Sequence, residues 1–326
     1  MKRLLIDTDT AGDDVTSLLF GLLWPGVQLD AIFTVMGNVP LELCTRNALT
    51  ALDHAGRSGE VPVFAGCDRP LMRPPIHSDF VHGKDGMGNS FFVPPRGKAE
   101  PLHAAQALVR FVNAAPGEYE IVAHGPLTNL AVAYMLDPSI VHKIKKLWIM
   151  GGACHFQGNI TPAAEYNVYA DPEAARMVFR AGFPIVMVGW EICCRYGIVG
   201  GEDLAALQAI DTPLARFYHQ INSAALKFNR ELGGLDGISH PDSQTTAICI
   251  NPAILQKSGR YFVEVECQSN QMRGYTAVDT RFHPEPNEFW QGGEPNAEVV
   301  HEVDYHGFYR MLSALLKGDF SEYSPA

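Results

Sequence analysis

Apolar runs of strand length alternate along the chain with longer segments in which apolar residues recur at helical spacing. Three strand and helix pairs occupy residues 4–7 and 15–24, 29–35 and 41–54, and 119–123 and 127–136. Such alternation is typical of β–α–β units. It predicts an α/β fold with an open, mostly parallel, Rossmann-like sheet, helices on both faces, and the active site at the carboxyl ends of the strands.

The second half of the chain continues this pattern less regularly. A helix is expected to begin at Asp171-Pro172-Glu173, where Asp caps the helix and Pro takes its first position. Further strands are predicted at 146–150, 184–188, 261–267 and 275–278, and further helices at 213–232, 243–250 and 308–317. Residues 67–97 are rich in Pro and Gly and follow neither period, which is typical of a lid or binding loop.

Composition narrows the class of protein. Of the 326 residues, 47% are apolar and 19% are charged, which excludes disordered and coiled-coil classes. No linker-like segment interrupts the chain, so we expect a single domain over residues 1–326. The seven cysteines include no C-x-x-C pair, and therefore suggest neither a disulfide framework nor a zinc ribbon.

Charge and hydropathy limit the partners. The 25 basic and 36 acidic residues give a net charge of −11, which disfavours a nucleic acid polymer because such binding depends on clustered positive charge. The apolar run at the N-terminus is too short for a signal peptide, and no run approaches the length of a membrane span. We therefore expect a cytoplasmic protein with no membrane partner.

Four aspartates lie in the short turn between the first predicted strand and the first predicted helix, at Asp7, Asp9, Asp13 and Asp14. Asp13 could cap the helix while the others are solvated turn residues. Four carboxylates at the carboxyl end of a parallel strand repel one another, however, and hard oxygen ligands suit Ca²⁺ or Mg²⁺. The cluster therefore favours a divalent cation site.

Polar residues also follow the other predicted strands and should converge on the same edge of the sheet. Asn38 follows the second strand, residues 124–129 follow the next, and Met150 leads into two glycines. Amides and a carboxylate within residues 158–167 could bind the hydroxyls of a sugar. Asp242 precedes an apolar helix, so it is either an N-cap or a further metal ligand.

Taken in order, these segments resemble the nucleoside hydrolases over nearly the whole chain. The resemblance is carried by Asp7-Thr8-Asp9-Thr10-Ala11-Gly12-Asp13-Asp14, Thr34-Val35-Met36-Gly37-Asn38-Val39, His82-Gly83, Gly86-Met87-Gly88, Gly125-Pro126-Leu127-Thr128-Asn129, Met150-Gly151-Gly152, Ala164-Glu165-Tyr166-Asn167 and Asp242. It implies an N-ribohydrolase of nucleoside salvage, a homodimer or homotetramer, that splits a ribonucleoside into free base and ribose.

The resemblance also implies roles for particular residues. Ca²⁺ at the bottom of the pocket would be held by Asp9, Asp14, the main-chain carbonyl of Thr128 and Asp242, with Asp9 also the general base. Ribose would be bound by Asp13, Asn38, Asn159, Glu165 and Asn167, with Met150 close by. These residue types suit the chemistry, because glycosidic cleavage passes through an oxocarbenium-like state that carboxylates and amides stabilise.

Two departures from the family pattern affect the turn and the leaving group. Thr10-Ala11-Gly12 stands where the family usually has Pro-Gly. Pro241 stands where many relatives have the histidine that protonates the leaving base. We expect either His240, one residue away, to take that role, which we favour, or aromatic stacking and ordered water around the base to replace it, an arrangement that favours purines. The base pocket has as candidates His82, Trp190, Glu191, Phe228 and Asn229, although aromatic residues at the ends of elements commonly pack in cores.

Two other functions remain open. Asp7-Thr8-Asp9 after an apolar strand also resembles the nucleophile motif of haloacid-dehalogenase-type phosphohydrolases, although Ala11 stands where that class has Thr or Val. The departures at Thr10-Ala11 and Pro241 would also fit a ribose- or nucleoside-binding module that has lost turnover. Release of phosphate, release of ribose, or binding without a reducing sugar would distinguish the three.

Overall fold

The computed structural model describes residues 1–281 and 293–323, and these contain a nine-stranded sheet in the order β10-β9-β11-β6-β5-β4-β1-β2-β3. Its strands are β1 (Lys2–Thr8), β2 (Val27–Thr34), β3 (Val63–Ala65), β4 (Tyr119–Ala123), β5 (Lys146–Met150), β6 (Ile185–Val188), β9 (Leu255–Val265), β10 (Thr276–Asp279) and β11 (Ala297–Val303). Every pairing from β11 to β3 is parallel, whereas β9 pairs antiparallel with both β11 and β10. The predicted α/β class and mostly parallel sheet are confirmed.

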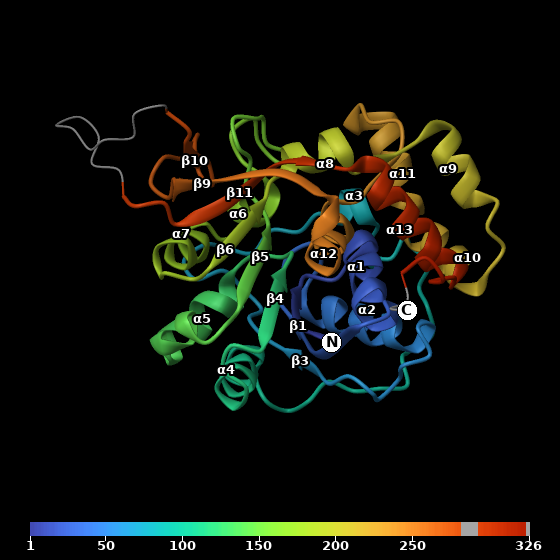
Figure 1. The fold of residues 1–326 in the computed structure, drawn as a ribbon, viewed down its shortest axis with the longest axis horizontal. Helices are drawn as coiled ribbons and strands as arrows, with labels where there is room; N and C mark the ends of the chain where they lie inside the picture. The colour runs from blue at the N-terminus through green and yellow to red at the C-terminus, as the bar shows by residue number, and fades with distance from the viewer. Residues whose placement is uncertain (282–292, 324–326) are drawn as a thin grey trace.

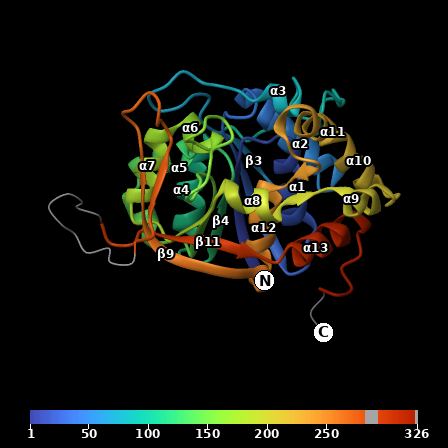
Figure 2. The same ribbon diagram turned by 90° about the horizontal axis from the view of Figure 1, so that it is seen from above.

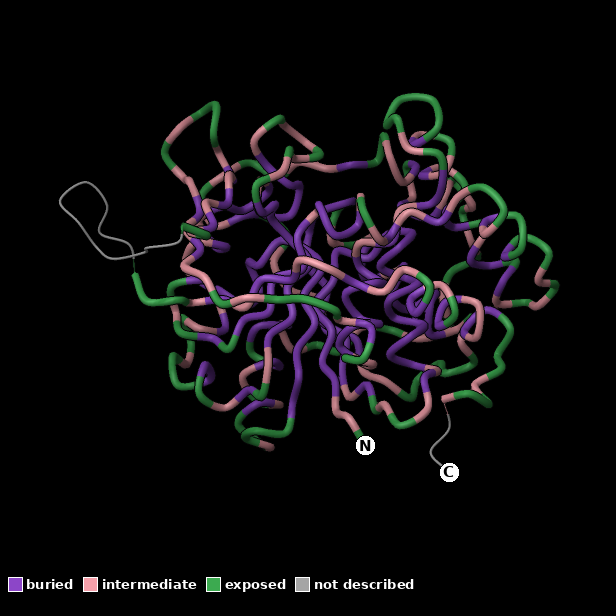
Figure 3. The backbone as a smooth tube through the Cα atoms, turned by 45° about the horizontal axis from the view of Figure 1, so that its top comes forward, coloured by how far each residue is buried: buried purple, intermediate pink, exposed green. Residues whose placement is uncertain are grey.

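Helices cover both faces of this sheet (Figures 1 and 2). One face carries α1 (Gly12–Leu23), α2 (Leu41–His54), α12 (Pro241–Ile250) and α13 (Tyr305–Lys317), and the other carries α4 (Ala104–Ala114), α5 (Thr128–Leu136) and α7 (Pro172–Arg180). The side chains of β1 explain why both faces need helices. Leu4 and Ile6 pack into the apolar cluster on one face, whereas Leu5 packs into the cluster on the other. Figure 3 shows the burial concentrated in the sheet and in the helix faces turned toward it.

The remaining elements lie mainly around the carboxyl edge of the sheet. They are α3 (Asp79–His82), α6 (Tyr166–Ala170), α8 (Trp190–Tyr196), α9 (Gly201–Gln208), α10 (Pro213–Ile221), α11 (Ser223–Phe228), a π-helical turn (Asn229–Gly233), two 3₁₀ turns (Pro138–His142 and Pro252–Ile254), and the small sheet of β7 (Ile198–Val199) and β8 (Ile238–Ser239). None of the helices in the described ranges is long and apolar enough to cross a membrane.

The predicted helix over 213–232 is wrong in one respect, because the chain breaks it at Asn222. The Asn222 side chain donates from Nδ2 to the carbonyl oxygen of Tyr218 at 2.9 Å, and the same residue is the N-cap of α11. The pattern of apolar residues also did not reveal β3, β11, α4, α8 or α9. Several of these are short, and the register of β11 against β9 shifts after Val300 and again after Glu302, so its buried positions do not alternate regularly.

Residues 67–97 form a mostly irregular segment, as predicted, but it is firmly anchored. The carboxylate of Asp85 accepts hydrogen bonds from the main-chain nitrogens of Met87, Asn89 and Phe91 at 2.7 to 2.9 Å. Met87 is buried. Gly88 has a positive φ of 69°, and a Cβ there would lie 2.4 Å from the carbonyl oxygen of Gln220. Close contact with α10 therefore fixes the segment that carries α3 and His82.

Asp171 caps α7 as predicted and also ties together three parts of the chain. Its Oδ1 accepts from the nitrogen of Ala174 at 3.1 Å, and its Oδ2 accepts from the nitrogen of Leu71 at 2.9 Å and from Oγ1 of Thr128 at 2.7 Å. The Asp171 side chain is completely buried. Its loss would leave three donors without an acceptor.

We therefore expect Asp171→Ala to lower the free energy of unfolding by about 3 kcal/mol or more, because each unsatisfied buried donor costs roughly 1 kcal/mol or more. The partly exposed cap Asp137, which also precedes a proline and accepts from the nitrogen of Ser139, provides the control. Asp137→Ala should cost only about 1 kcal/mol. Chemical denaturation measures both, and equal losses would contradict this account of Asp171.

Candidate active site

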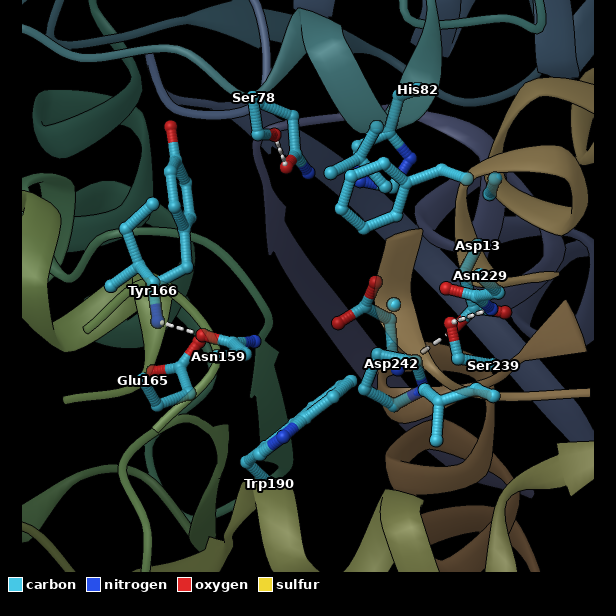
Figure 4. Close-up of a pocket in the computed structure, with 18 of the residues that line it drawn as sticks. Asp13, Ser78, His82, Asn159, Glu165, Tyr166, Trp190, Asn229, Ser239 and Asp242 are labelled. Atoms are coloured by element: carbon cyan, nitrogen blue, oxygen red, sulfur yellow. Dashed lines mark hydrogen bonds between the residues drawn. The ribbon is translucent and has the colours of Figure 1, made fainter. Parts of the chain in front are cut away.

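A cavity of about 380 Å³ opens at the carboxyl edge of the sheet (Figure 4). Its wall includes Asn38, His124, Met150 and Trp190, which stand at or just beyond the ends of β2, β4, β5 and β6. Its volume lies within the roughly 300–1,000 Å³ of small-molecule sites. The cavity therefore lies where the parallel sheet predicted it.

The structure brings most of the predicted substrate-binding residues to this cavity. Its lining includes Asp13, Asn38, His82, Met150, Asn159, Glu165, Asn167, Trp190, Phe228 and Asp242. Asp9, Asp14 and Thr128 lie behind the wall and are almost completely buried. The hydroxyl of Thr128 donates to Asp171, which fixes the start of α5.

Asp9 is held in place from one side only. Its Oδ2 accepts from the main-chain nitrogen of Asn38 at 2.7 Å, whereas its Oδ1 is buried and has no hydrogen-bond donor among the described residues. Burial and the charge of Asp14 raise the pKa of Asp9 well above its usual range. A buried carboxylate oxygen without a donor is unfavourable unless a proton or a cation occupies it.

Gly37 makes this arrangement possible. A Cβ at Gly37 would lie 2.0 Å from Oδ2 of Asp9, so no larger residue fits while Asn38 donates to that oxygen. The loop after β2 can therefore approach Asp9 only because this position is glycine.

Asp14 is the most completely hydrogen-bonded carboxylate of the cluster. Its Oδ1 accepts from Thr8 Oγ1 at 2.7 Å and His124 Nδ1 at 2.9 Å, and its Oδ2 accepts from the nitrogen of Ala11 at 3.0 Å and from Asn38 Nδ2 at 3.1 Å. Burial alone would raise the pKa of Asp14, but His124 and the other donors outweigh it and lower that pKa. Asp14 is thus the carboxylate that stays ionised.

Asp242 approaches Asp14 from the start of α12. Ligand atoms of Asp14, His124 and Asp242 all lie within 4.8 Å of one another. Burial raises the pKa of Asp242 well above its usual range, and the charges of Asp14, Asp13 and Asp9 raise it further. Convergent carboxylates, one of them with an oxygen lacking a donor, fit a divalent cation with hard oxygen ligands.

Asp13 joins the two helices that carry these carboxylates. From α1 its Oδ2 accepts from the nitrogens of Asp242 and Ser243 at 2.8 and 3.0 Å, and its Oδ1 accepts from Ser243 Oγ at 2.6 Å. It therefore caps α12 from outside that helix and fixes Asp242. Because a carboxylate can accept about four hydrogen bonds, Asp13 still has capacity for a ligand in the cavity that it lines.

The opposite wall is built around Glu165 (Figure 4). Its carboxylate caps α6 by accepting from the nitrogens of Asn167 and Val168, and it also accepts from the nitrogen of Gly152 at 2.9 Å. Burial nevertheless raises the pKa of Glu165 to about 7. Asn159 accepts on Oδ1 from the nitrogen of Tyr166 at 2.8 Å, which leaves its amide nitrogen to donate to a hydroxyl.

His82 and aromatic residues form the outer part of the cavity. Nδ1 of His82 is buried without a hydrogen-bond partner in the described parts of the chain, and burial lowers the pKa of this imidazole. Phe80 and Phe228 meet edge to face across the cavity rim, with ring centroids 5.7 Å apart. The π-helical turn follows Phe228 directly, and such turns often occur at functional sites.

His240 does not line the cavity, which argues against its predicted role as acid for the leaving base. Its side chain is completely buried, Nδ1 contacts the carbonyl oxygen of Gly197 at 3.1 Å, and Nε2 contacts the hydroxyl of Tyr218 at 2.7 Å. The ring also packs against Phe308. Both ring nitrogens of His240 therefore have partners in the core. His240 is the N-cap residue of α12, and the proline that follows it begins that helix.

The unusual turn at Thr10-Ala11 is compatible with the cluster. The nitrogen of Thr10 donates to Thr8 Oγ1 at 3.1 Å, and the nitrogen of Ala11 donates to Asp14. Sequence reasoning assigned no role to several residues of the cavity wall, among them Ser78, Phe80, His124 and Asn222. His124 stood within the recognised polar segment after β4, whereas Ser78 and Asn222 gave no signal.

Comparison with known proteins agrees with this geometry. A sequence model of the family "Inosine-uridine preferring nucleoside hydrolase" matches residues 4–310. The pyrimidine-specific ribonucleoside hydrolase RihB of Escherichia coli (strain SE11) is 31% identical over 318 residues, which cover 97% of each chain.

Two solved structures are also similar to this chain. A plant nucleoside hydrolase (PpNRh1) superposes with a TM-score of 0.88 and 33% identity, covering 97% of this chain and 99% of its own. A purine-preferring ribonucleoside hydrolase from Gardnerella vaginalis gives a TM-score of 0.86 and 26% identity, with the same coverage. The match excludes the phosphohydrolase alternative. The chain belongs to the inosine-uridine preferring nucleoside hydrolase family, whose members hydrolyse the N-glycosidic bond of ribonucleosides.

Proposed function

We propose that this protein hydrolyses ribonucleosides to free base and ribose with the help of Ca²⁺ bound at the bottom of the cavity. The observation that carries the proposal is the buried Oδ1 of Asp9, which has no donor within residues 1–281 and 293–323 and belongs to a cluster with Asp14 and Asp242. The ligands would be carboxylates of Asp9, Asp14 and Asp242 and the main-chain carbonyl of Thr128. When bound, the cation would lower the pKa of a water and orient ribose hydroxyls.

The residues around the cavity would perform the other steps. Asp9 would accept on Oδ1 the proton of the attacking water. Asp13 and Glu165 would bind the ribose hydroxyls, together with the amides of Asn38, Asn159 and Asn167. Because their charges and dipoles are held by main-chain hydrogen bonds before the substrate arrives, they would stabilise positive charge on ribose with little reorganisation.

The leaving base would depart into the outer part of the cavity, between Trp190 and the rim formed by Phe80 and Phe228. We assign its protonation to His82 rather than His240, because Nδ1 of His82 is the imidazole nitrogen at the cavity that lacks a partner in the described ranges. Burial lowers the pKa of His82 and the charge of Asp14 partly opposes this, so the imidazole would take up a proton from solvent before donating it to the base.

Nucleoside salvage, a cytoplasmic location and a homodimeric or homotetrameric state are further parts of the proposal. They are supported by the family resemblance. Sedimentation analysis of the purified chain tests the oligomeric state, and a monomer would contradict it.

Removal of the cation should abolish ribose release from inosine and uridine and lower the melting temperature, because the carboxylate cluster is then uncompensated. Both effects should be reversed by added Ca²⁺. Reducing-sugar assays and thermal melts of chelator-treated protein measure this. Full activity after chelation would contradict the cation site, and nucleoside binding without any reducing sugar would indicate a binding module.

Asp9→Asn should reduce kcat by about two to four orders of magnitude while the protein still folds, since an amide cannot take the proton from water. Asp14→Asn is the matched control in the same cluster. That change should weaken Ca²⁺ binding because it removes charge from the ionised ligand. Near-normal turnover by Asp9→Asn would exclude Asp9 as the base.

His82→Ala should slow inosine and uridine cleavage by about two to four orders of magnitude and spare 4-nitrophenyl riboside, whose phenolate leaves without a proton. His240→Ala, which disrupts contacts in the core, should lower the melting temperature and affect both kinds of substrate alike. The ratio of kcat/KM values between the two substrates is the readout. A selective effect in His240→Ala and none in His82→Ala would reverse our assignment.

A further inference from the structure

His124 is a buried histidine whose position the proposed mechanism does not use. It follows β4 directly and is 1% exposed. Its Nδ1 lies 2.9 Å from Oδ1 of Asp14, and its Nε2 lies 2.8 Å from Oγ of Ser17 on α1. Ser17 Oγ in turn lies 2.6 Å from Oγ1 of Thr246 on α12. A continuous chain of hydrogen bonds thus runs from Thr246 to Asp14.

Asp14, at the end of this series of hydrogen bonds, determines which atom donates in each of them. Both oxygens of Asp14 accept from other donors, on Thr8, Ala11 and Asn38, so Asp14 acts as the acceptor and Nδ1 of His124 carries the hydrogen. In the neutral ring Nε2 then accepts from the hydroxyl of Ser17, which accepts from Thr246. Neither ring nitrogen keeps a free lone pair, so His124 is not itself a ligand despite its place within 4.8 Å of Asp14 and Asp242.

The network connects the two helices that carry the carboxylates. Ser17 lies one turn after Asp14 on α1, and Thr246 lies one turn after Asp242 on α12. Of the four donors to Asp14, Asn38 Nδ2 makes the longest contact, at 3.1 Å, and belongs to the cavity wall. The donors on Thr8, Ala11 and His124 make shorter contacts with the carboxylate, at 2.7 to 3.0 Å.

We propose that His124 is a positioning residue for the cation site: its Nδ1–H holds Asp14 in the orientation that ligates, and the Ser17–Thr246 link supports the ring. This inference rests on the proposed cation-dependent function. A general packing role would not depend on one donor atom, whereas this role requires the Nδ1–H group of His124. Residues that orient metal ligands in this way typically change metal affinity by about 10–100-fold.

Two substitutions separate the ring nitrogens of His124. The amide nitrogen of Asn can take the place of the Nδ1–H donor, and the amide oxygen of Gln can take the place of Nε2 as acceptor for Ser17. His124→Asn therefore keeps the donor to Asp14 and loses the contact with Ser17, whereas His124→Gln does the reverse. Both replace the ring by a smaller polar group, so they are matched in the packing that they disturb.

Calorimetric titration of Ca²⁺ into the chelator-treated full chain tests the proposal. We expect His124→Gln to weaken Ca²⁺ binding about 10–100-fold and His124→Asn to weaken it much less. Ser17→Ala should resemble His124→Asn. The melting temperatures of the Ca²⁺-free variants should fall to similar extents, so that a structural effect alone would not separate Asn from Gln.

Equal Ca²⁺ affinities of His124→Asn and His124→Gln would overturn the inference, as would wild-type affinity in both. In either case saturable binding by the wild-type chain would leave the proposed function intact. If the wild-type chain itself binds no Ca²⁺, the cation site is wrong, and the inference fails with it. If His124→Gln does not fold, equally weak binding by His124→Asn and Ser17→Ala, both at least 10-fold below wild type, would overturn it.

Discussion

Repulsion among buried carboxylates is the constraint on which the active site depends. Asp9, Asp13, Asp14 and Asp242 meet at one edge of the sheet, where each is almost completely out of contact with solvent. Main-chain and side-chain donors compensate Asp13 and Asp14, but Asp9 keeps an oxygen with no donor in the described residues, and Asp242 has a strongly raised pKa. The fold thus compensates these charges only in part, and the divalent cation that we propose would complete the compensation.

The rest of the structure can be understood as support for this cluster. β1 delivers Asp9, α1 presents Asp13 and Asp14 at its first turn, and Asp13 caps α12 so that Asp242 comes near. Gly37 lets the loop after β2 approach Asp9, and the buried His124 reaches Asp14 from the end of β4. Segments far apart in the sequence therefore fix a few oxygen atoms, which is how a parallel sheet places a site at the ends of its strands.

The sequence predicted the part of this arrangement that depends on local pattern. Strands with continuous apolar residues and the Asp-Pro start of α7 could be placed, and the acidic turn indicated a cation. The predictions that the structure does not support concern features that depend on tertiary contacts. His240 is one residue from the expected acid, but the start of α12 turns it into the core beside Tyr218. The break at Asn222 likewise depends on a contact that no local pattern records.

The number of Ca²⁺ ions bound per chain tests the central claim most directly. Elemental analysis of the purified, active protein after exhaustive dialysis measures it, with the Asp9→Ala, Asp242→Ala double variant as the reference. We expect one Ca²⁺ per wild-type chain and none in the variant, because the variant removes the carboxylate with an oxygen that lacks a donor among the described residues and a second carboxylate whose pKa is strongly raised. An active wild-type protein that carries no divalent cation would contradict the account.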